Sequence, residues 1–274
     1  MITRDEVVRY ERDGFLVVPG FLSHTEVDAL LSHYMSVHSE GGHGWTEGSI
    51  DPESSDPLKR YPRLLQMHRF DMTSLRFMLD PRIREVLEAL LGSTPYAVQT
   101  MMYYKPAGAR GQALHQDQRY LNVRPGTCMA AWLALDDCDE ENGCLQVVPG
   151  SHRLEVICPV KADSSVSFTT ETVPVPEGME VVELPMKAGD MLFFNGQLIH
   201  GSRPNRTADR FRRIVVGHYI VGEAQAVASF YHPVLTMDGR EVKLEVSPYG
   251  GPCGAYVGGE FRPMSTIEAA LAAH

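Results

Sequence analysis

The chain has 274 residues, of which 43% are hydrophobic and 22% charged, and this composition excludes a disordered, collagen-like or coiled-coil protein. The 35 acidic residues outnumber the 25 basic ones, and the net charge of −10 argues against nucleic acid and anionic membranes as partners. The longest apolar run, from Cys128 to Leu135, is as long as a buried strand and too short for a membrane span.

The N-terminus and the cysteines together predict a cytoplasmic protein. Asp5 and Glu6 lie where a secretory signal would have a basic patch followed by an apolar core. The number of cysteines is odd, and their spacing matches neither a CxxC pair nor a zinc-binding pattern. We therefore expect reduced, mostly structural thiols at all five positions: Cys128, Cys138, Cys144, Cys158 and Cys253.

The first two predicted elements are short amphipathic helices. Thr3 with Glu6, and Ser23 with Glu26, have the spacing of a capping box at the start of a helix. Apolar residues recur at helical spacing behind the second box, which predicts that this helix packs one face against a core.

A polar stretch from Gly41 to Pro62 follows these helices. We interpret this stretch either as a solvated surface loop or as a lid over a substrate. The second interpretation is open because long ordered loops in compact enzymes are often functional. The next helix is expected to follow Asp80, with Pro81 as its first residue, and to stop at Gly92.

Short apolar runs separated by turn residues follow, and they predict a β-sandwich or barrel. The chain shows no alternation of strands and helices, which disfavours a doubly wound nucleotide-binding fold. A last helix is expected from Ile267 to Ala273, capped by Ser265 with Glu268. The expected strands are 97–105, 127–135, 144–148, 181–184, 191–194, 198–200 and 213–221.

His115-Gln116-Asp117 is the first candidate metal motif. The triplet alone is weak evidence, because such spacings arise by chance. Two similar His-x-Glu triplets, beginning at His24 and His38, fall on a predicted helix, where residues two apart point in different directions. His115 and Asp117 instead lie at the mouth of a predicted strand, where residues two apart share a face and converge on one ion.

His200, which follows the last apolar residues of a predicted strand, is the second candidate ligand. Taken alone, a histidine at a strand end is more often a hydrogen-bonded structural residue than a metal ligand. Together with His115 and Asp117 it completes a set of two imidazoles and one carboxylate. This set leaves positions open on one face of a ferrous ion for a co-substrate and dioxygen.

A basic run over residues 210–213 leads into the last predicted strand. Alternation along that strand places Arg212 on one face with Ile214, Val216 and His218. An arginine that faces an apolar interior needs an anion, because an unpaired buried charge is costly. A dicarboxylate ligand held by the guanidinium is one solution, and an acidic side chain of the protein is the other.

The ordered combination of these motifs resembles the phytanoyl-CoA dioxygenase family, a branch of the iron(II)- and 2-oxoglutarate-dependent oxygenases. The resemblance extends from Asp13 to about Tyr219. It implies a mainly β fold with flanking helices, namely a double-stranded β-helix or cupin-like jelly roll. The motifs that carry it are His115-Gln116-Asp117, Ala131-Trp132, Val148-Pro149-Gly150-Ser151-His152 and His200-Gly201-Ser202 with Pro204-Asn205.

The resemblance also implies roles for individual residues. His115, Asp117 and His200 correspond to the iron ligands. The remaining implied residues contact 2-oxoglutarate, with Arg212 and Ser202 at its far carboxylate and Trp132 and Gln99 along the pocket.

The chain departs from the family pattern in the basic run. The arginine often lies eleven residues after the second histidine, and Phe211 occupies that position here. Arg212 therefore requires a one-residue insertion, and Arg210 and Arg213 remain alternatives.

The activity implied by the resemblance is hydroxylation of an unactivated C–H bond of a small organic metabolite, with release of succinate and CO2. Fe(II), 2-oxoglutarate and O2 are the implied cofactor and co-substrates. Desaturation and cyclisation remain alternatives, whereas the presence of Asp117 disfavours halogenation. We expect a small-molecule substrate and neither nucleic acid nor membrane as a partner, and the oligomeric state stays open.

We expect a single oxygenase domain over residues 1–274. Residues 1–94 form a helical flank with a candidate lid, 95–222 the jelly-roll core and 223–274 a C-terminal extension. One rival is a non-oxidative, metal-dependent jelly roll of the cupin type, either an enzyme or a binding protein. A second rival is an oxygenase that uses the same cofactors but acts on a protein side chain.

Overall fold

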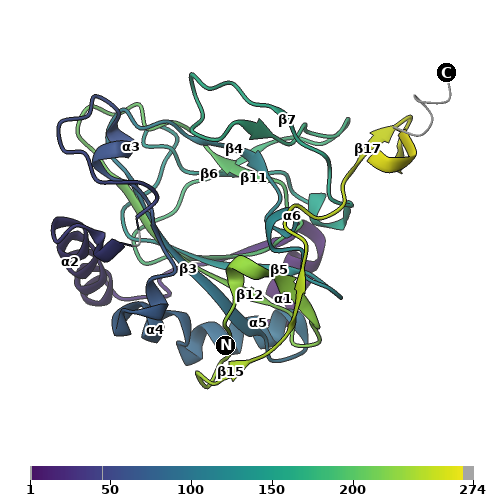
Figure 1. The fold of residues 1–274 in the computed structure, drawn as a ribbon, viewed down its shortest axis with the longest axis horizontal. Coiled ribbons are helices and arrows are strands. Elements are labelled where there is room, and N and C mark those ends of the chain that lie inside the picture. Colours follow the sequence, from purple (N-terminus) through teal and green to yellow (C-terminus); the bar gives the residue numbers. More distant parts are fainter. Residues whose placement is uncertain (1, 45, 268–274) are drawn as a thin grey trace.

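Two facing β-sheets form the centre of the molecule, and helices cover the outer face of the larger one (Figure 1). The computed structural model describes residues 2–44 and 46–267. This arrangement is the predicted jelly roll, built mainly from strands with helices at its flank. None of the helices in these two ranges combines the length and apolar character that crossing a membrane requires.

The large sheet joins strands from both halves of the chain in the order β1-β10-β5-β12-β3-β14-β15, with β2 beside β3. All its pairings are antiparallel, as expected for a jelly roll. Its strands are β1 (Phe15–Val18), β2 (Leu64–Leu65), β3 (Tyr96–Lys105), β5 (Cys128–Ala134), β10 (Met191–Asn195), β12 (Arg212–Ile220), β14 (Val234–Thr236) and β15 (Glu241–Val242).

The small sheet has the order β4-β11-β6-β9 and lies opposite the large one (Figure 1). Its strands are β4 (Gln112–His115), β6 (Leu145–Val147), β9 (Val182–Leu184) and β11 (His200–Ser202). Strand β4, which sequence analysis did not delimit, ends at the first candidate metal ligand.

Alternation along β5 supplies two separate cores. Ala130 and Trp132 face the space between the sheets, whereas Met129, Ala131 and Leu133 face the helices. Each strand residue points to the opposite side from its neighbour. The near-continuous apolar run of β5 is therefore explained by burial on both faces.

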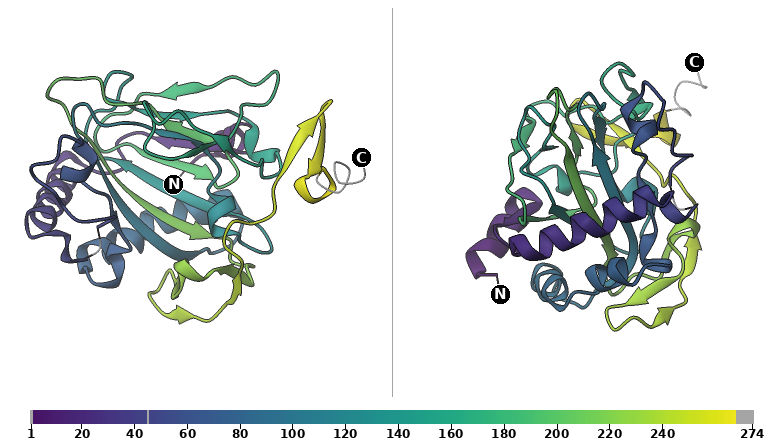
Figure 2. Two further views of the ribbon diagram at one scale, coloured as in Figure 1. Left: turned by 45° about the horizontal axis from the view of Figure 1, so that its top comes forward. Right: turned by 90° about the vertical axis from the view of Figure 1, so that its left-hand side faces the viewer.

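Three of the predicted helices begin where their caps were expected. Thr3 and Ser23 each form a complete capping box. Asp80 caps the helix that starts at Pro81, and Gly92 ends it in the left-handed conformation that glycine tolerates best. The longer helices, visible below and beside the large sheet in Figures 1 and 2, are α1 (Arg4–Asp13), α2 (His24–Ser39), α4 (Met72–Met78) and α5 (Pro81–Leu91).

The remaining short elements connect the sheets and build the C-terminal extension. In the extension, β14 pairs with β3 and so enlarges the main sheet, while the hairpin β17–β18 stands to one side (Figure 2). These elements are α3 (Pro57–Arg60), α6 (Gln118–Leu121), η1 (Gly42–Gly44), η2 (Met67–Arg69), η3 (Ser151–Arg153), η4 (Ser229–Tyr231), β7 (Val160–Lys161), β8 (Glu171–Thr172), β13 (Ala226–Ala228), β16 (Glu245–Ser247), β17 (Gly254–Val257) and β18 (Glu260–Pro263).

The expected C-terminal helix is only partly described. Helical backbone begins at Met264, one residue before Ser265, so Ser265 is not the cap that the sequence predicted. Glu268 and the rest of the predicted helix lie outside the described residues.

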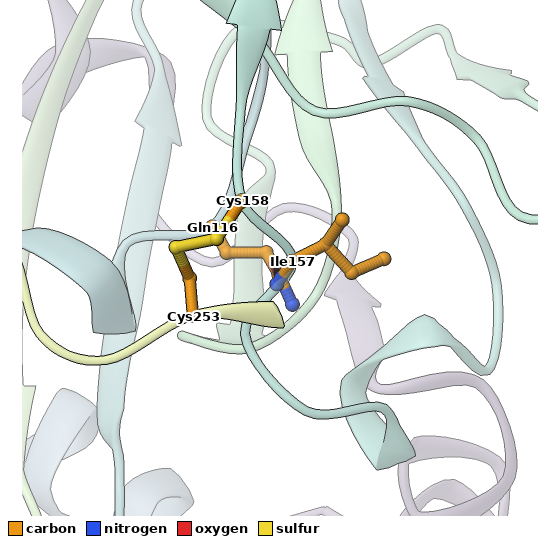
Figure 3. The surroundings of a disulfide bond; sticks show 4 residues. All are labelled: Gln116, Ile157, Cys158 and Cys253. Carbon is orange, nitrogen blue, oxygen red and sulfur yellow. Dashed lines mark hydrogen bonds between the residues drawn. A yellow bond between two sulfur atoms is a disulfide. The ribbon is translucent and has the colours of Figure 1, made fainter. Parts of the chain in front are cut away.

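The prediction of five reduced thiols is wrong for two of them. Cys158 and Cys253, 95 residues apart in the sequence, form a disulfide (Figure 3), whereas the other three cysteines are free and buried. The pairing depends on how the C-terminal extension folds back, which the cysteine spacing does not reveal. Because disulfides are rare in the cytosol, the cysteines no longer support a cytoplasmic location.

Buried His68 makes stability depend on pH. Its Nδ1 lies 3.0 Å from the Thr100 hydroxyl of β3, and burial lowers the pKa of His68 to about 4. The folded protein therefore binds fewer protons than the unfolded chain between pH 4 and 6.5. The stability that neutral His68 contributes is fully present above pH 6.5 and is lost as the pH falls towards 4. The free energy of unfolding is expected to decrease by at most about 3 kcal/mol over this range.

The free energy of unfolding, measured in urea at several pH values, tests this dependence. His68→Gln is expected to flatten its pH slope between pH 4 and 6.5. An unchanged slope in this variant contradicts the assignment.

Candidate active site

A cavity of about 530 Å³ lies between the two sheets, a volume typical of small-molecule sites. Both sheets contribute to its wall. The structure brings all seven residues that the sequence singled out into this one cavity: Gln99, His115, Asp117, Trp132, His200, Ser202 and Arg212.

His115, Asp117 and His200 form a compact cluster of metal-binding atoms. One donor atom from each lies within 4.8 Å of the others. The Asp117 carboxylate is 3.4 Å from His115 Nε2 and 3.7 Å from His200 Nε2. In the described parts of the chain, this is the only group of three such side chains close enough to share an ion.

Backbone carbonyls orient both imidazoles of this cluster. Nδ1 of His115 lies 2.9 Å from the carbonyl of Ala113, and Nδ1 of His200 lies 2.9 Å from the carbonyl of Leu198. A carbonyl only accepts hydrogen bonds, so each Nδ1 carries the proton. In the neutral form of each ring, Nε2 then keeps its lone pair, as a metal ligand must.

The two histidines converge because they are paired across the small sheet, where His200 of β11 lies opposite His115 of β4. Asp117 arrives differently from the prediction. Strand β4 ends at His115, and Asp117 has helical dihedral angles (φ −61°, ψ −33°) just before α6. The shared face of a strand is thus not the reason for the convergence, since the chain turns from strand to helix between these residues.

Gln116, between His115 and Asp117, lies beside Ile157 (Figure 3) and links the turn to distant backbone. Its side-chain carbonyl accepts a hydrogen bond from the backbone N–H of Ile157 at 2.8 Å. Its amide donates to the carbonyl of Gln197, also at 2.8 Å, close to His200. No local sequence pattern predicts a role for this buried residue, because its partners are distant in the sequence.

The protonation states of the cluster suit a divalent cation. Burial alone raises the pKa of Asp117, but the imidazoles of His200, His115 and His218 outweigh it and hold the pKa well below its ordinary value. Burial, aided by His115, lowers the pKa of His200 to about 4. One carboxylate and neutral imidazole are thus available at neutral pH, a donor set that fits ferrous iron.

His218 is a further histidine of the cavity. It lies on the same inward face of β12 as Arg212, as alternation predicted, and its Nε2 is 3.3 Å from the Asp117 carboxylate. Its Nδ1 is buried without a hydrogen-bond partner. His218 is therefore placed to hold the carboxylate in position.

Arg212 is buried, with 3% of its surface exposed, and faces the cavity. It donates to the Gly143 carbonyl at 3.2 Å and to the Ser202 hydroxyl at 3.4 Å, and its guanidinium lies 5.6 Å from the centre of the Trp132 ring. Among the described residues, no carboxylate is within ion-pair distance of it. A buried cation in this state needs an anion from outside the protein.

The neighbouring basic residues are occupied elsewhere. Arg213 pairs with Asp136 at 2.7 Å, and Arg210 pairs with Asp139 at 2.7 Å. Phe211, at the position where the family often has the arginine, packs against Tyr61 outside the cavity. The geometry therefore favours Arg212 among the three arginines that the sequence left open.

The sequence did not predict which residues form the outer wall of the cavity. The candidate lid is absent from it, since no described residue of 41–62 lines the cavity. Tyr120 of α6 lines the cavity, whereas its neighbours Gln118 and Arg119 do not. The C-terminal extension contributes four further lining residues, which we call the mouth because all but Tyr231 are exposed: Ser229, Phe230, Tyr231 and Tyr249.

Comparison with known proteins supports one family. A model of the phytanoyl-CoA dioxygenase (PhyH) family matches residues 10–214. The peroxisomal phytanoyl-CoA dioxygenase of Rattus norvegicus is 28% identical over 227 residues, covering 77% of this chain and 66% of the rat protein, just under two thirds of its length. The ectoine dioxygenase of Bordetella bronchiseptica is 28% identical over 222 residues, covering 74% of this chain and 71% of that protein.

One of the similar solved structures is that of an enzyme whose overall reaction differs from hydroxylation. The crystal structure of SnoN, described as an α-ketoglutarate-dependent non-haem epimerase from nogalamycin biosynthesis, matches with a TM-score of 0.62 and 25% identity. The match covers 80% of this chain and 81% of that one. The jelly-roll fold is thus confirmed, while the fold itself does not determine the outcome of the reaction.

Proposed function

The chain belongs to the phytanoyl-CoA dioxygenase family, and on this premise we propose that it hydroxylates an unactivated C–H bond of a small organic metabolite. Its reaction class is that of the family, the 2-oxoglutarate-dependent non-haem iron dioxygenases. The observation that carries the proposal is one cavity holding both a His-Asp-His cluster and a buried arginine without a carboxylate partner. We assign all of these parts to a single domain.

His115, Asp117 and His200 would hold the iron. The backbone bonds at their Nδ1 atoms keep the two imidazoles in the tautomer that binds a metal. Three protein ligands leave room for further ligands on the open side of the ion. When bound, iron with 2-oxoglutarate and O2 supplies an oxidant for C–H bonds, and 2-oxoglutarate leaves as succinate and CO2.

Arg212 and Ser202 would bind the far carboxylate of 2-oxoglutarate. A guanidinium matches a carboxylate with two parallel hydrogen bonds, and a buried one does so without competition from water. Trp132 and Gln99 line the same cavity and would shape the space around the bound co-substrate.

The remaining cavity wall would hold the substrate. It is mostly aromatic on the side of the mouth, where Tyr120, Phe230 and Tyr231 line it, and this favours a small organic molecule with an apolar part. The task of this wall is to orient one C–H bond towards the metal and to exclude water, because the cofactor carries the chemistry.

Anaerobic titration of the protein with ferrous iron and then with 2-oxoglutarate tests the proposal. A weak visible metal-to-ligand charge-transfer band is expected only when both are present. Slow production of succinate in air is then expected to follow, and candidate substrates are expected to accelerate it. Iron binding without any spectral response to 2-oxoglutarate would instead favour the non-oxidative jelly-roll enzyme or binding protein.

We further propose that substrate choice depends on the C-terminal extension. Its mouth residues lie beyond residue 214, where the match to the family ends. Tyr249 is 68% exposed and lies near Tyr120, with 6.2 Å between the ring centres. The disulfide at Cys253, four residues after Tyr249, anchors this segment to the core beside Ile157 (Figure 3).

Loss of this disulfide is expected to destabilise the fold and loosen the mouth. Cys158→Ser with Cys253→Ser removes a cross-link between residues 95 apart, and the expected cost is about 2–5 kcal/mol in the free energy of unfolding. Chemical denaturation of the oxidised protein and the variant measures it. A reductant should reproduce the loss in wild type and have no effect on the double variant. Equal stability of variant and wild type would contradict the expectation.

A further inference from the structure

Lys105, the last residue of β3, is a buried basic residue outside the predicted set. It is 3% exposed, and its amino nitrogen lies 2.8 Å from the Ser202 hydroxyl, 3.2 Å from the Gly143 carbonyl and 2.5 Å from the Arg203 carbonyl. None of these partners carries a negative charge. Such isolation of a lysine in the interior is costly, and it requires an explanation.

Lys105 and Arg212 share the same surroundings. Both lie within hydrogen-bonding distance of the Gly143 carbonyl and of the Ser202 hydroxyl. Two buried basic groups thus converge on one hydroxyl that lines the cavity. Lys105 itself lies behind Ser202 and does not line the cavity, so it would act on a ligand through that hydroxyl.

The acidic and titratable groups around this pair do not neutralise it. The Asp136 and Glu183 carboxylates are paired with Arg213 and Arg203. The other titratable groups near the amine are two thiols, and burial raises the pKa of Cys138 to about 12 and that of Cys144 to about 11. Both thiols are therefore neutral at physiological pH.

Without a ligand, the surroundings of Lys105 shift its amine towards the neutral form, because its three hydrogen-bond partners are all uncharged. Burial, followed by repulsion from Arg212, lowers the pKa of Lys105 well below its ordinary value. A neutral amine donates two hydrogen bonds and accepts one. The three contacts match this pattern if the amine donates to the two carbonyls and accepts from the Ser202 hydroxyl.

We propose that Lys105 is a positioning residue of the co-substrate pocket and that 2-oxoglutarate binds with uptake of one proton, from solvent, by its amino group. This inference rests on the proposed function. A carboxylate at Arg212 and Ser202 adds the missing negative charge and stabilises the ammonium form. The ammonium then donates all three hydrogen bonds, which frees the Ser202 O–H to donate to the ligand.

Calorimetric titration of the Mn(II)-loaded protein with 2-oxoglutarate, in two buffers of different ionisation enthalpy at pH 8, counts the protons taken up. Wild type is expected to take up close to one proton per site. Its affinity is expected to fall about tenfold per pH unit wherever Lys105 is neutral before binding. Lys105→Met should abolish the uptake and weaken binding at least tenfold, whereas exposed Lys161→Met should change neither.

Wild-type binding without proton uptake overturns the inference, even if no variant can be purified. Lys105→Arg provides a second test, because arginine stays charged and should bind 2-oxoglutarate with no uptake. Uptake that persists in Lys105→Met or Lys105→Arg would assign the proton to another group and also refute the inference. Absence of any 2-oxoglutarate binding by the wild-type metal complex would instead refute the proposed function.

Discussion

Replacing Arg212 with methionine is expected to weaken 2-oxoglutarate binding by roughly 100-fold or more while iron binding persists. Truncation of one member of a buried charge pair typically costs about 2–5 kcal/mol, because the other charge is left unpaired. The folded protein without ligand should lose little stability, since Arg212 has no carboxylate partner among the described residues and lies beside Lys105. Titration of the iron complex with 2-oxoglutarate, followed by the charge-transfer band, measures the affinity.

The other two arginines of the basic run provide matched controls. Arg210 and Arg213 each form an ion pair outside the cavity, so Arg210→Met and Arg213→Met should keep an affinity close to wild type. A large loss of affinity in either control, with Arg212→Met unaffected, would move the co-substrate contact to that arginine. It would also mean that the alternation argument had selected the wrong residue.

Removal of the Asp117 carboxylate has the second large expected effect, on the metal itself. Asp117→Ala should weaken ferrous iron binding by more than roughly 100-fold and abolish succinate production. Even loss of a residue that merely supports a ligand typically costs about 10–100-fold in metal affinity. Anaerobic titration with Fe(II), monitored by the metal-induced rise in melting temperature, measures the loss.

His218→Gln separates a supporting role from a ligand role. His218 contacts the Asp117 carboxylate at 3.3 Å and is not a member of the cluster itself. Its replacement is expected to weaken iron binding by roughly 10-fold, less than the loss in Asp117→Ala. If His218→Gln loses iron as completely as Asp117→Ala, the ligand set has been assigned incorrectly.

Much of the site could be predicted because its signals are local. Alternation along one strand separated Arg212 from Arg213, and the structure places them on opposite faces of β12. The first two capping boxes and the Pro81 and Gly92 boundaries depend on neighbouring residues alone, and the structure confirms them. The metal cluster consists of one local triplet and the distant His200. Only the family resemblance indicated that His200 belongs to the same site.

Other features depended on which distant segments meet. The partner of Cys158 follows it by 95 residues, and Lys105 meets Ser202 only because β3, β12 and β11 converge. The path from His115 to Asp117 was predicted as a strand, but the chain turns into α6, where Gln116 makes contacts with remote backbone. No pattern of adjacent residues encodes such contacts.

The sequence by itself determined the start of three helices, the face of β12 that carries Arg212, the family and seven of the residues that line the cavity. These follow from steric and hydrogen-bonding preferences within a few residues and from motifs in a fixed order. Only the tertiary structure decided the disulfide, the aromatic mouth formed by the C-terminal extension and the isolation of Lys105 and Arg212 from carboxylates. The reason is physical, because burial and charge neutralisation depend on every segment that surrounds a group, and chain folding alone brings those segments together.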